Sequence, residues 1–257
     1  MSEKAGGKKH EGGRPHGKLP YKRIVLKLSG EVLGGSSKSI LDVNFTREVL
    51  GQIKAVADLG VQIGIVVGGG NILRGCQAVK GGLGRVSADS IGMLGTIMNG
   101  IALRDIGHSI GLEIHVLSCL PSSSFAEPYA VEEAVAYLEQ GKVVVFVGGT
   151  GNPYLTTDTA AAIRAAEIRA DAILKATKVS GVFSCDPMVD SKATRFETLS
   201  FKDAMRLDLG FMDKSSLCLC DEAEIPVVVF NVYEKDSILR VAKGEKIGTT
   251  VAGVSHD

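Results

Sequence analysis

Small, hydroxyl-bearing and amide side chains connect an apolar segment to a helical one at residues 148–168. Residues 143–147 before them are β-branched or aromatic throughout, which is typical of a buried parallel strand. Thr156, Thr157 and Asp158 stand at the start of the helix that follows. Free backbone N–H groups and the positive end of the helix dipole attract anions there, so the segment predicts an anion site. A simple helix cap is the alternative, and one such residue alone would favour it.

Two further loops shift the balance toward an anion site. The apolar segment 63–67 runs into three glycines, 68–70, which let a backbone approach a ligand closely. The segment 23–28 carries Lys27 and is followed by Ser29. Three strand ends therefore carry residues suited to binding phosphate. Neither standard nucleotide fingerprint, GxxxxGKS/T or GxGxxG, is present, which excludes a P-loop and weakens a dinucleotide interpretation.

The segments around these loops alternate between strands and helices. We expect strands at residues 23–28, 61–67, 113–118, 143–147, 172–175 and 227–231, helices at 44–59, 86–107, 131–140, 159–169, 215–224 and 237–243, and a hairpin-like segment around 181–183. Such alternation predicts an α/β fold with a largely parallel central sheet and helices on both faces. Ligands then collect at the carboxyl ends of the strands, where all three loops fall.

Composition and charge are those of an ordinary globular enzyme. At 257 residues and 45% hydrophobic content, the chain is long enough for one sizeable core. Lysine plus arginine and aspartate plus glutamate number 29 each, so no global field attracts nucleic acid or an anionic membrane. The five cysteines are odd in number and lack CxxC spacing, which predicts a reducing cytoplasm. We expect no apolar stretch of the roughly 18 residues that a membrane span needs.

The first twenty residues differ in kind from the rest. Five lysines and arginines against two glutamates give residues 1–20 a local charge of +3, among glycines and without apolar periodicity. This pattern predicts a disordered basic tail, with a functional basic arm as the alternative. Residues 21–257 are expected to form a single domain.

Four motifs, in their order and spacing, resemble the amino acid kinase family. They are KLSGE at residues 27–31, GGGNILRG at 68–75, GTGNPYLTTD at 149–158 and LKATKVSGVFSCDP at 174–187. The resemblance runs from about Tyr21 to Gly253 and, within the family, is to bacterial members that phosphorylate UMP. It implies the amino acid kinase fold and transfer of a phosphoryl group from ATP to UMP.

For such a reaction the attacking group is an oxygen of the UMP phosphate. Its second pKa is about 6, so it is mostly ionised near neutral pH and needs no general base. The protein has instead to bring two polyanions together and align them. Lys27 is the first candidate for a catalytic residue that bridges the phosphates. The resemblance implies that Asp158 organises this lysine and nearby backbone donors, and Lys175 is a weaker candidate for a second cation.

The resemblance also implies where the acceptor UMP is bound. A guanidinium at Arg74 would hold the phosphate bidentately, and Asp89 would accept hydrogen bonds from the ribose. Thr150, Asn152 and Thr157 would offer hydrogen bonds to the uracil edge. The complete expected UMP set is Gly69, Arg74, Asp89, Thr150, Gly151, Asn152, Pro153, Tyr154, Leu155, Thr156 and Thr157.

The donor ATP is expected beside the first loop and the end of the 172–175 strand. Thr177, Phe183 and Asp186 match positions that contact the base and ribose of ATP in similar proteins. The complete expected ATP set is Lys27, Leu28, Ser29, Gly30, Gly70, Thr177, Phe183 and Asp186. Mg²⁺ is expected to arrive with ATP, because it prefers phosphates and waters to a protein cage, so no protein metal ligand is assigned.

Similar bacterial enzymes are activated by GTP and inhibited by UTP, which the resemblance extends to this chain as expected effectors. Arg104 matches one arginine of the GTP site, whereas the other two positions carry His115 and Lys142. The resemblance further implies a homo-oligomer, a hexamer assembled from dimers. The apolar run 91–103 is suited either to packing against a partner helix or to the internal core.

Three other functions compete with this interpretation. A related kinase acting on a carboxylate or carbamate would share the ATP half but lack the pair of Arg74 and Asp89. A non-catalytic nucleotide-binding protein would keep the loops and lose Lys27. A nicotinamide-dependent oxidoreductase would need the glycine fingerprint that the sequence lacks.

Overall fold

The computed structural model describes residues 19–35, 39–185, 189–190 and 192–253. Its helices are α1 (Gly30–Leu33), α2 (Val43–Ala57), α3 (Gly75–Lys80), α4 (Arg85–Ser109), α5 (Val131–Glu139), α6 (Thr157–Glu167), α7 (Phe201–Arg206), α8 (Lys214–Glu222) and α9 (Ser237–Ala242). Its strands are β1 (Arg23–Leu28), β2 (Gln62–Val67), β3 (Ile114–Ser118), β4 (Glu127–Pro128), β5 (Val143–Val147), β6 (Ala172–Thr177), β7 (Thr198–Ser200), β8 (Val227–Asn231) and β9 (Thr249–Ala252). The expected basic tail falls almost entirely outside the described residues.

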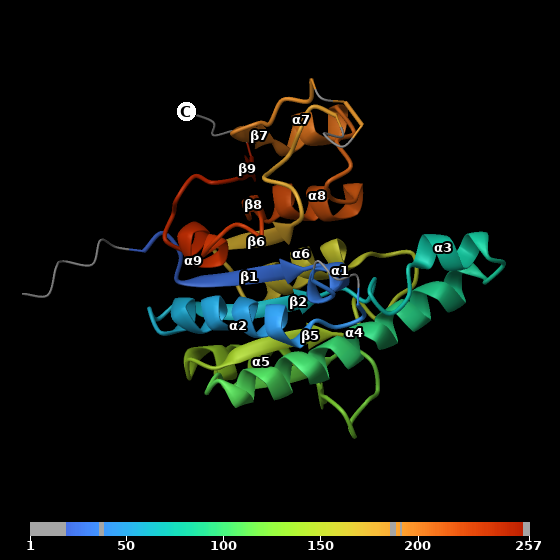
Figure 1. Ribbon diagram of the computed structural model, residues 1–257, viewed down its shortest axis with the longest axis vertical. Coiled ribbons are helices and arrows are strands. Elements are labelled where there is room, and N and C mark those ends of the chain that lie inside the picture. Colours follow the sequence, from blue (N-terminus) through green and yellow to red (C-terminus); the bar gives the residue numbers. More distant parts are fainter. Residues whose placement is uncertain (1–18, 36–38, 186–188, 191, 254–257) are drawn as a thin grey trace, which may run out of the picture.

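One sheet runs through the whole described part of the chain (Figure 1). Its nine strands follow the order β4-β3-β5-β2-β1-β6-β8-β9-β7. Every neighbouring pair is parallel except β8 and β9, which are antiparallel. The predicted α/β fold with a largely parallel sheet is therefore confirmed. The β1 strand lies centrally, between β2 and β6, so its carboxyl end meets loops from both halves of the sheet.

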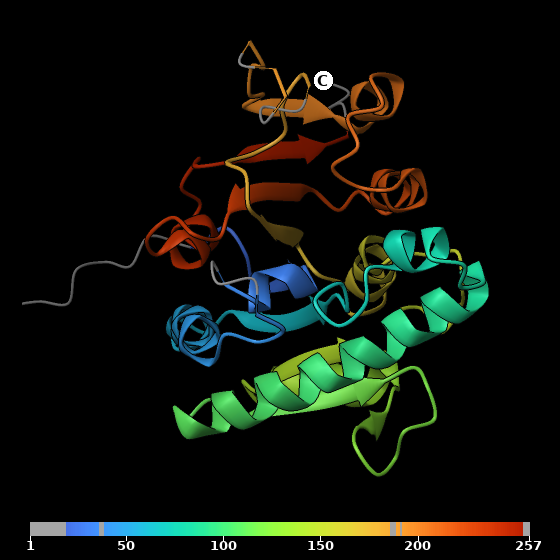
Figure 2. The same ribbon diagram turned by 45° about the vertical axis from the view of Figure 1, so that its right-hand side comes forward.

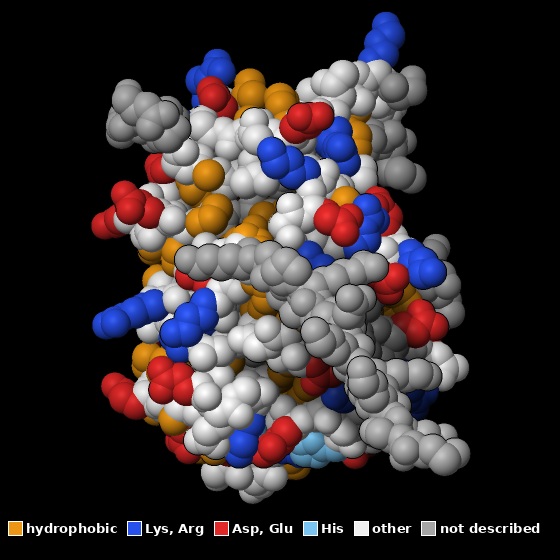
Figure 3. Space-filling model, turned by 90° about the vertical axis from the view of Figure 1, so that its left-hand side faces the viewer, with side chains coloured by type: hydrophobic (Ala, Val, Ile, Leu, Met, Phe, Trp, Pro, Cys, Tyr) orange, Lys and Arg blue, Asp and Glu red, His pale blue; other side chains and the backbone are white. Residues whose placement is uncertain are grey.

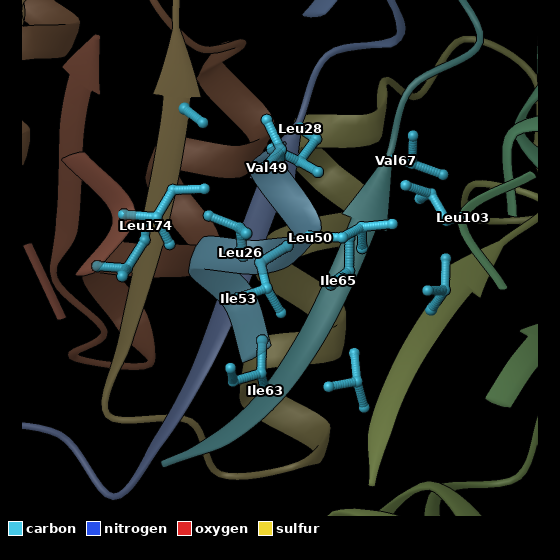
Figure 4. Close-up of a cluster of buried hydrophobic side chains, with 14 of the residues drawn as sticks. Leu26, Leu28, Val49, Leu50, Ile53, Ile63, Ile65, Val67, Leu103 and Leu174 are labelled. Carbon is cyan, nitrogen blue, oxygen red and sulfur yellow. The ribbon is translucent and has the colours of Figure 1, made fainter. Parts of the chain in front are cut away.

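Helices cover both faces of this sheet, and alternate residues of each strand point to opposite faces. On one face, Leu26 and Ile65 pack with Leu50 of α2 and Leu103 of α4 in a buried cluster, which Figure 4 shows in close-up. On the other face, Val25 packs in a second cluster with α5, α6 and α8. Both faces of β1 are therefore buried, as the uninterrupted apolar strand segments predict.

Helix α4 is the longest helix of the described chain, at 25 residues, and packs against β3, β5 and α2. Its first turns, with α3, project beyond the carboxyl ends of the strands (Figures 1 and 2). By length and composition α4 could cross a membrane, so the expectation of no such stretch is wrong on that criterion. The core helix of a soluble protein passes the same test, and α4 carries two buried polar residues that hydrogen-bond the backbone of loops at the ends of strands.

Several short elements were not predicted, namely α1, α3, β4, β7, α7 and β9. Each has between two and six residues, which is too short for a hydrophobic period to be visible in the sequence. The expected hairpin-like segment is an isolated antiparallel bridge between Phe183 and Arg195. On the face shown in Figure 3, positive and negative side chains are interspersed, in line with the equal numbers of the two charges.

Candidate active site

Lys27 and Lys175 lie side by side at the centre of the sheet. Lys27 in β1 is the register partner of Lys175 in β6. Because Leu26 and Leu28 belong to the cluster beneath α2, alternation turns Lys27 toward the opposite face, where α6 lies. Asp158, in the first turn of α6, accepts hydrogen bonds from both ammonium groups through one oxygen. Its Oδ1 is 2.8 Å from Lys27 Nζ and 2.6 Å from Lys175 Nζ.

The three charges of this site are buried together. The side chains of Lys27, Lys175 and Asp158 are 9%, 8% and 14% exposed. Burial alone would raise the pKa of Asp158, but the two lysines outweigh it and lower the pKa to about 2. Burial, and then the charge of Lys27, lowers the pKa of Lys175 to about 8. Two cations against one carboxylate leave the buried site with an excess positive charge at neutral pH, which suits an anionic ligand.

The first two loops approach each other so closely that they require glycine. A Cβ on Gly30 would lie 2.7 Å from the carbonyl oxygen of Gly68 and 2.3 Å from Asn71 Oδ1. A Cβ on Gly69 would lie 2.2 Å from the carbonyl oxygen of Gly92 in α4. Real Cβ atoms do not approach backbone this closely, so the glycines allow the KLSG segment, the triple glycine and α4 to meet. The sequence predicted a close approach of the triple glycine to a ligand. In the structure, the close approach is to α4 and to the first loop.

Two buried polar residues of α4 hold two of the loops, and sequence reasoning missed both. Asn99 Nδ2 donates to the carbonyl oxygen of Gly68 at 2.7 Å and pairs with the amide of Asn71. Thr96 Oγ1 accepts from the backbone N–H of Gly148 at 2.7 Å. Because Thr96 and Asn99 are one helical turn apart, one face of α4 ties the second loop to the third. The available signal was a pair of polar residues inside an otherwise apolar helix.

The start of α6 is fixed by a second helix end. Thr156 caps α6 by accepting from the backbone N–H of Asp158 at 3.0 Å, as the capping alternative predicted. The Thr156 hydroxyl also donates to Asp213, which caps α8. Thr159 Oγ1 donates to the same carboxylate at 3.0 Å. Asp213 thus positions the helix that carries Asp158, and Thr157 faces Gly68 from the same turn.

Asp89 reaches from α4 to the expected uracil loop. Its Oδ2 accepts from the backbone N–H of Tyr154 at 2.8 Å and from Arg85 Nε at 2.7 Å. Tyr154 has a φ of +70°, which a bulky side chain adopts at a cost, and the bond from Asp89 holds it there. Thr150 and Asn152 hydrogen-bond each other across the turn of the same loop. The expected ribose and base residues are therefore brought together by the fold.

Arg74, the expected phosphate ligand, forms an ion pair with Glu31 of α1. Its Nη2 is 2.9 Å from Glu31 Oε1, and the arginine side chain is 50% exposed. Arg74 and Glu31 line a cavity of about 360 Å³, together with Gly70, Asn71 and Lys178. Sequence reasoning missed Glu31 as a partner, because its position in KLSGE identifies a loop and not the contact.

The expected donor residues are only partly brought together. Thr177 ends β6, and its hydroxyl donates to the carbonyl oxygen of Val179 at 2.8 Å and accepts from the Val179 N–H. Phe183 lies in the bridge with Arg195 and is half-buried. Asp186 lies outside the described residues. Leu28 is buried in the core, so any contact that it makes with a ligand comes from its backbone.

His115 and Lys142 lie near the amino ends of β3 and β5, where both contact Glu113, and Arg104 of α4 donates to the carbonyl oxygen of Phe125 at 3.4 Å. His115 Nδ1 is 3.0 Å from Glu127 Oε1, and its Nε2 is 3.4 Å from Glu113 Oε1. Lys142 Nζ is 2.9 Å from the same oxygen of Glu113. Burial alone would raise the pKa of Glu127, but its hydrogen bonds and the charges of His115 and Arg104 lower it overall. The expected effector residues form one cluster, in which carboxylates already engage His115 and Lys142.

The described residues offer no group of three or more His, Cys, Asp or Glu side chains placed to hold a metal ion. The buried carboxylate of the site, Asp158, is engaged by two lysines. Mg²⁺ that is carried by a nucleotide is commonly held by phosphate oxygens and waters, which does not need such a group.

The fold and the site together are suited to binding phosphate groups at the carboxyl edge of a parallel sheet. Comparison with known proteins is more specific. The sequence model of the amino acid kinase family matches residues 22–231, and the chain belongs to this family. The resemblance noted from the four motifs is confirmed.

Individual relatives match nearly the whole chain. A uridylate kinase of Legionella pneumophila strain Corby is 43% identical over 240 residues, which are 93% of this chain and 97% of the relative. The crystal structure of a UMP kinase from Bacillus anthracis superimposes with a TM-score of 0.88 at 38% identity, covering 92% of this chain and 98% of that one. A UMP kinase from Ureaplasma parvum gives 0.85 at 35% identity, covering 90% and 98%.

Proposed function

We propose that this chain transfers the γ-phosphoryl group of ATP to UMP, giving ADP and UDP. The observation that carries the proposal is the buried group of Lys27, Lys175 and Asp158 at the meeting point of three glycine loops. Uridylate kinases that match nearly the whole chain support UMP as the acceptor.

In the proposed reaction, an oxygen of the UMP phosphate attacks the γ-phosphorus of ATP in line with the bond to the β–γ bridging oxygen. That bond breaks as the new P–O bond forms, and ADP leaves with the electron pair, so no proton has to move. Lys27 neutralises charge on the transferring group, and Lys175 adds to the positive potential. Asp158, with a pKa of about 2, stays ionised and orients both ammonium groups. Mg²⁺ bound to ATP supplies further charge neutralisation on the phosphates.

On the acceptor side, Arg74 would bind the UMP phosphate and Asp89 the ribose hydroxyls. The bond between Asp89 and the Tyr154 N–H supports this assignment, because it joins the ribose residue to the uracil loop. Carboxylate and carbamate acceptors have no ribose or base, so a kinase for them does not need such a loop. Thr150, Asn152 and Thr157 would recognise uracil, and polar groups matched to uracil stay unpaired against cytosine.

We also propose that the chain self-associates through α4. Ile91, Leu94 and Met98 lie on one side of this helix and are 39%, 54% and 56% exposed. Large apolar side chains that recur at helical spacing and face outward are typical of an interface. A homohexamer, as the family resemblance implies, would bury such a row, and GTP and UTP remain proposed effectors.

A cytoplasmic location and a single domain over residues 21–257 complete the proposal. Among the cysteines that the structure describes, Cys119, Cys185, Cys218 and Cys220 are free thiols, which suits a reducing compartment. Deletion of residues 1–19 should leave the activity intact, because both the family match and the described sheet begin after them.

The decisive experiment is a coupled assay in which the full chain is incubated with Mg²⁺, ATP and one acceptor at a time. The acceptors are UMP, CMP, dTMP, aspartate and carbamate. We expect ADP release with UMP at a catalytic efficiency at least tenfold above that with CMP. Equal efficiency on CMP would contradict the assignment of the uracil loop. Turnover of aspartate or carbamate in place of UMP would overturn the proposed function.

A further inference from the structure

Glu31 joins two cations that come from different parts of the chain. Its Oε1 is 2.9 Å from Arg74 Nη2, and its Oε2 is 3.3 Å from Lys178 Nζ. Arg74 directly precedes α3 and follows the triple glycine, and Lys178 follows β6. Both oxygens of one carboxylate are therefore used, one for each cation. In the proposed function, Arg74 belongs to the acceptor side and Lys178 adjoins Thr177 on the donor side.

The bridge between Glu31 and the two cations is exposed enough for a ligand to replace it. Arg74 and Lys178 are each about half exposed, at 50% and 51%, and Glu31 is 36% exposed. Ion pairs at such exposure hold weakly, because water screens the charges and the long side chains lose entropy. The bridge lines the cavity of about 360 Å³ beside Gly70, so a ligand phosphate can reach both cations. A dianionic phosphate competes well with one carboxylate for a guanidinium.

We propose that Glu31 is a positioning residue that acts as a displaceable counter-ion for Arg74 and Lys178. Without nucleotide, its carboxylate keeps the two cations beside the cavity. When phosphate groups enter, their oxygens replace the carboxylate on each cation. This inference rests on the proposed function, because it assigns the two cations to the two nucleotides.

The proposal makes a prediction about direction. If Glu31 competes with phosphate, Glu31→Gln keeps the size of the side chain but removes the competing charge. Nucleotides should then bind more tightly, by about two- to fivefold, which is the range that a weak ion pair corresponds to. Values of KM for UMP and ATP should fall. The value of kcat should not rise, because Glu31 does not contact the phosphoryl group that is transferred. A residue that only supported the fold would produce the opposite change in KM.

The experiment measures the dissociation constants of UMP and of the non-hydrolysable analogue AMP-PNP by calorimetry, for the wild type and Glu31→Gln. The same substitution is then made in Arg74→Gln and in Lys178→Gln. We expect the gain in UMP affinity to fall by at least half in the Arg74→Gln background. The gain in AMP-PNP affinity should fall likewise in the Lys178→Gln background. Glu48→Gln, an exposed glutamate of α2, is the matched control and should change neither constant.

Unchanged or weaker binding of both nucleotides in Glu31→Gln would overturn the inference. So would equal gains in every background, because Glu31 would then act by general repulsion and not through these two cations. The coupled assay on the wild type separates this outcome from failure of the proposed function. If the wild type neither binds nor phosphorylates UMP, the proposed function fails, and the inference stands or falls on AMP-PNP and Lys178.

Discussion

Lys27 and Lys175 are register partners on adjacent parallel strands, and their ammonium groups share a single carboxylate oxygen of Asp158. Two like charges on neighbouring strands repel each other in a buried site, and an anion between them offsets this repulsion. Asp158 supplies this anion from the first turn of α6, where the capped helix end fixes its position. The arrangement leaves one positive charge in excess for the phosphates, and its charge balance determines the first three predictions.

Replacing Lys27 should lower kcat by about two to three orders of magnitude with little effect on stability. Lys27→Met keeps the buried stem but removes the charge, and Asp158 retains Lys175 as its partner. Loss of one group that stabilises the transition state costs about 10²- to 10³-fold in kcat. Steady-state kinetics and thermal unfolding check both parts. Lys54→Met, which removes an ion pair on the outer side of α2, is the control and should leave kcat unchanged. Near wild-type turnover in Lys27→Met would refute the assignment.

Removing the anion should damage the fold more than removing a cation. Asp158→Asn leaves two buried ammonium groups without a counter-charge, which costs about 3–5 kcal/mol in the free energy of unfolding. The double variant with Lys27→Met should recover part of this loss. The folded pKa of Asp158 lies below its unfolded value, so its contribution is complete above about pH 4 and is lost as the pH falls toward 2. Urea denaturation from pH 7 to 3 measures this, and Asp158→Asn with wild-type stability at pH 7 would disprove it.

The charge of Lys175 sets an alkaline limit on the activity. Its pKa of about 8 means that the ammonium is lost as the pH rises through this value, so kcat should fall above pH 8. In the unfolded chain, Lys175 keeps its proton up to a higher pH. The free energy of unfolding should therefore not fall over the pH range in which kcat falls. Lys175→Gln should have a lower kcat that changes little between pH 7 and 9. The same decline in this variant as in the wild type would show that another group titrates.

The longer strands and the polar residues that follow them were predictable from the sequence, because both are local signals. The resemblance placed Lys27 and Asp158 in the site, and the fold brings their side chains together. Lys175, a weaker candidate from the sequence, lies as close to Asp158 as Lys27 does. Its proximity to Lys27 depends on the register of β1 with β6, strands that lie far apart in the sequence.

The supports of the loops were not predictable in the same way. Thr96 and Asn99 lie in an apolar helix, and nothing local shows that they bind Gly148 and Gly68. The bridge from Glu31 depends on where α3 begins, and α3 is too short to be visible as a period. Contacts between distant loops thus required the three-dimensional structure, whereas the longer strands and helices did not.

Gly69 should be intolerant of any side chain. A Cβ there would lie 2.2 Å from the backbone oxygen of Gly92, so Gly69→Ala must displace either the loop or α4. We expect a loss of about 1–3 kcal/mol in stability and at least a tenfold rise in KM for UMP. Gly51→Ala is the matched control, because a Cβ on Gly51 meets nothing within 4 Å and alanine favours a helix. It should be slightly stabilising. Equal, small effects of both substitutions would show that the loop can yield.

The cluster of Arg104, His115 and Lys142 predicts weak, pH-dependent activation by GTP. Carboxylates of Glu113 and Glu127 engage His115, and Glu113 also engages Lys142, so a triphosphate must displace them. Lysine lacks the planar fork of arginine, which weakens phosphate binding further. An imidazole, unlike a guanidinium, carries no permanent charge, so GTP should bind more tightly at pH 6 than at pH 8.

Titration of the initial rate against GTP at pH 6 and pH 8 measures this dependence. Tyr137, which stacks on His115 at 3.7 Å between ring centres and donates to Glu127, keeps its proton throughout, because its hydrogen bond to Glu127 raises its pKa to about 12. His115→Arg should strengthen activation by GTP and reduce its dependence on pH, since the charge becomes permanent and bidentate. Arg104→Ala is the control and should abolish activation. Strong activation that is independent of pH and survives loss of Arg104 would show that GTP acts elsewhere on the protein.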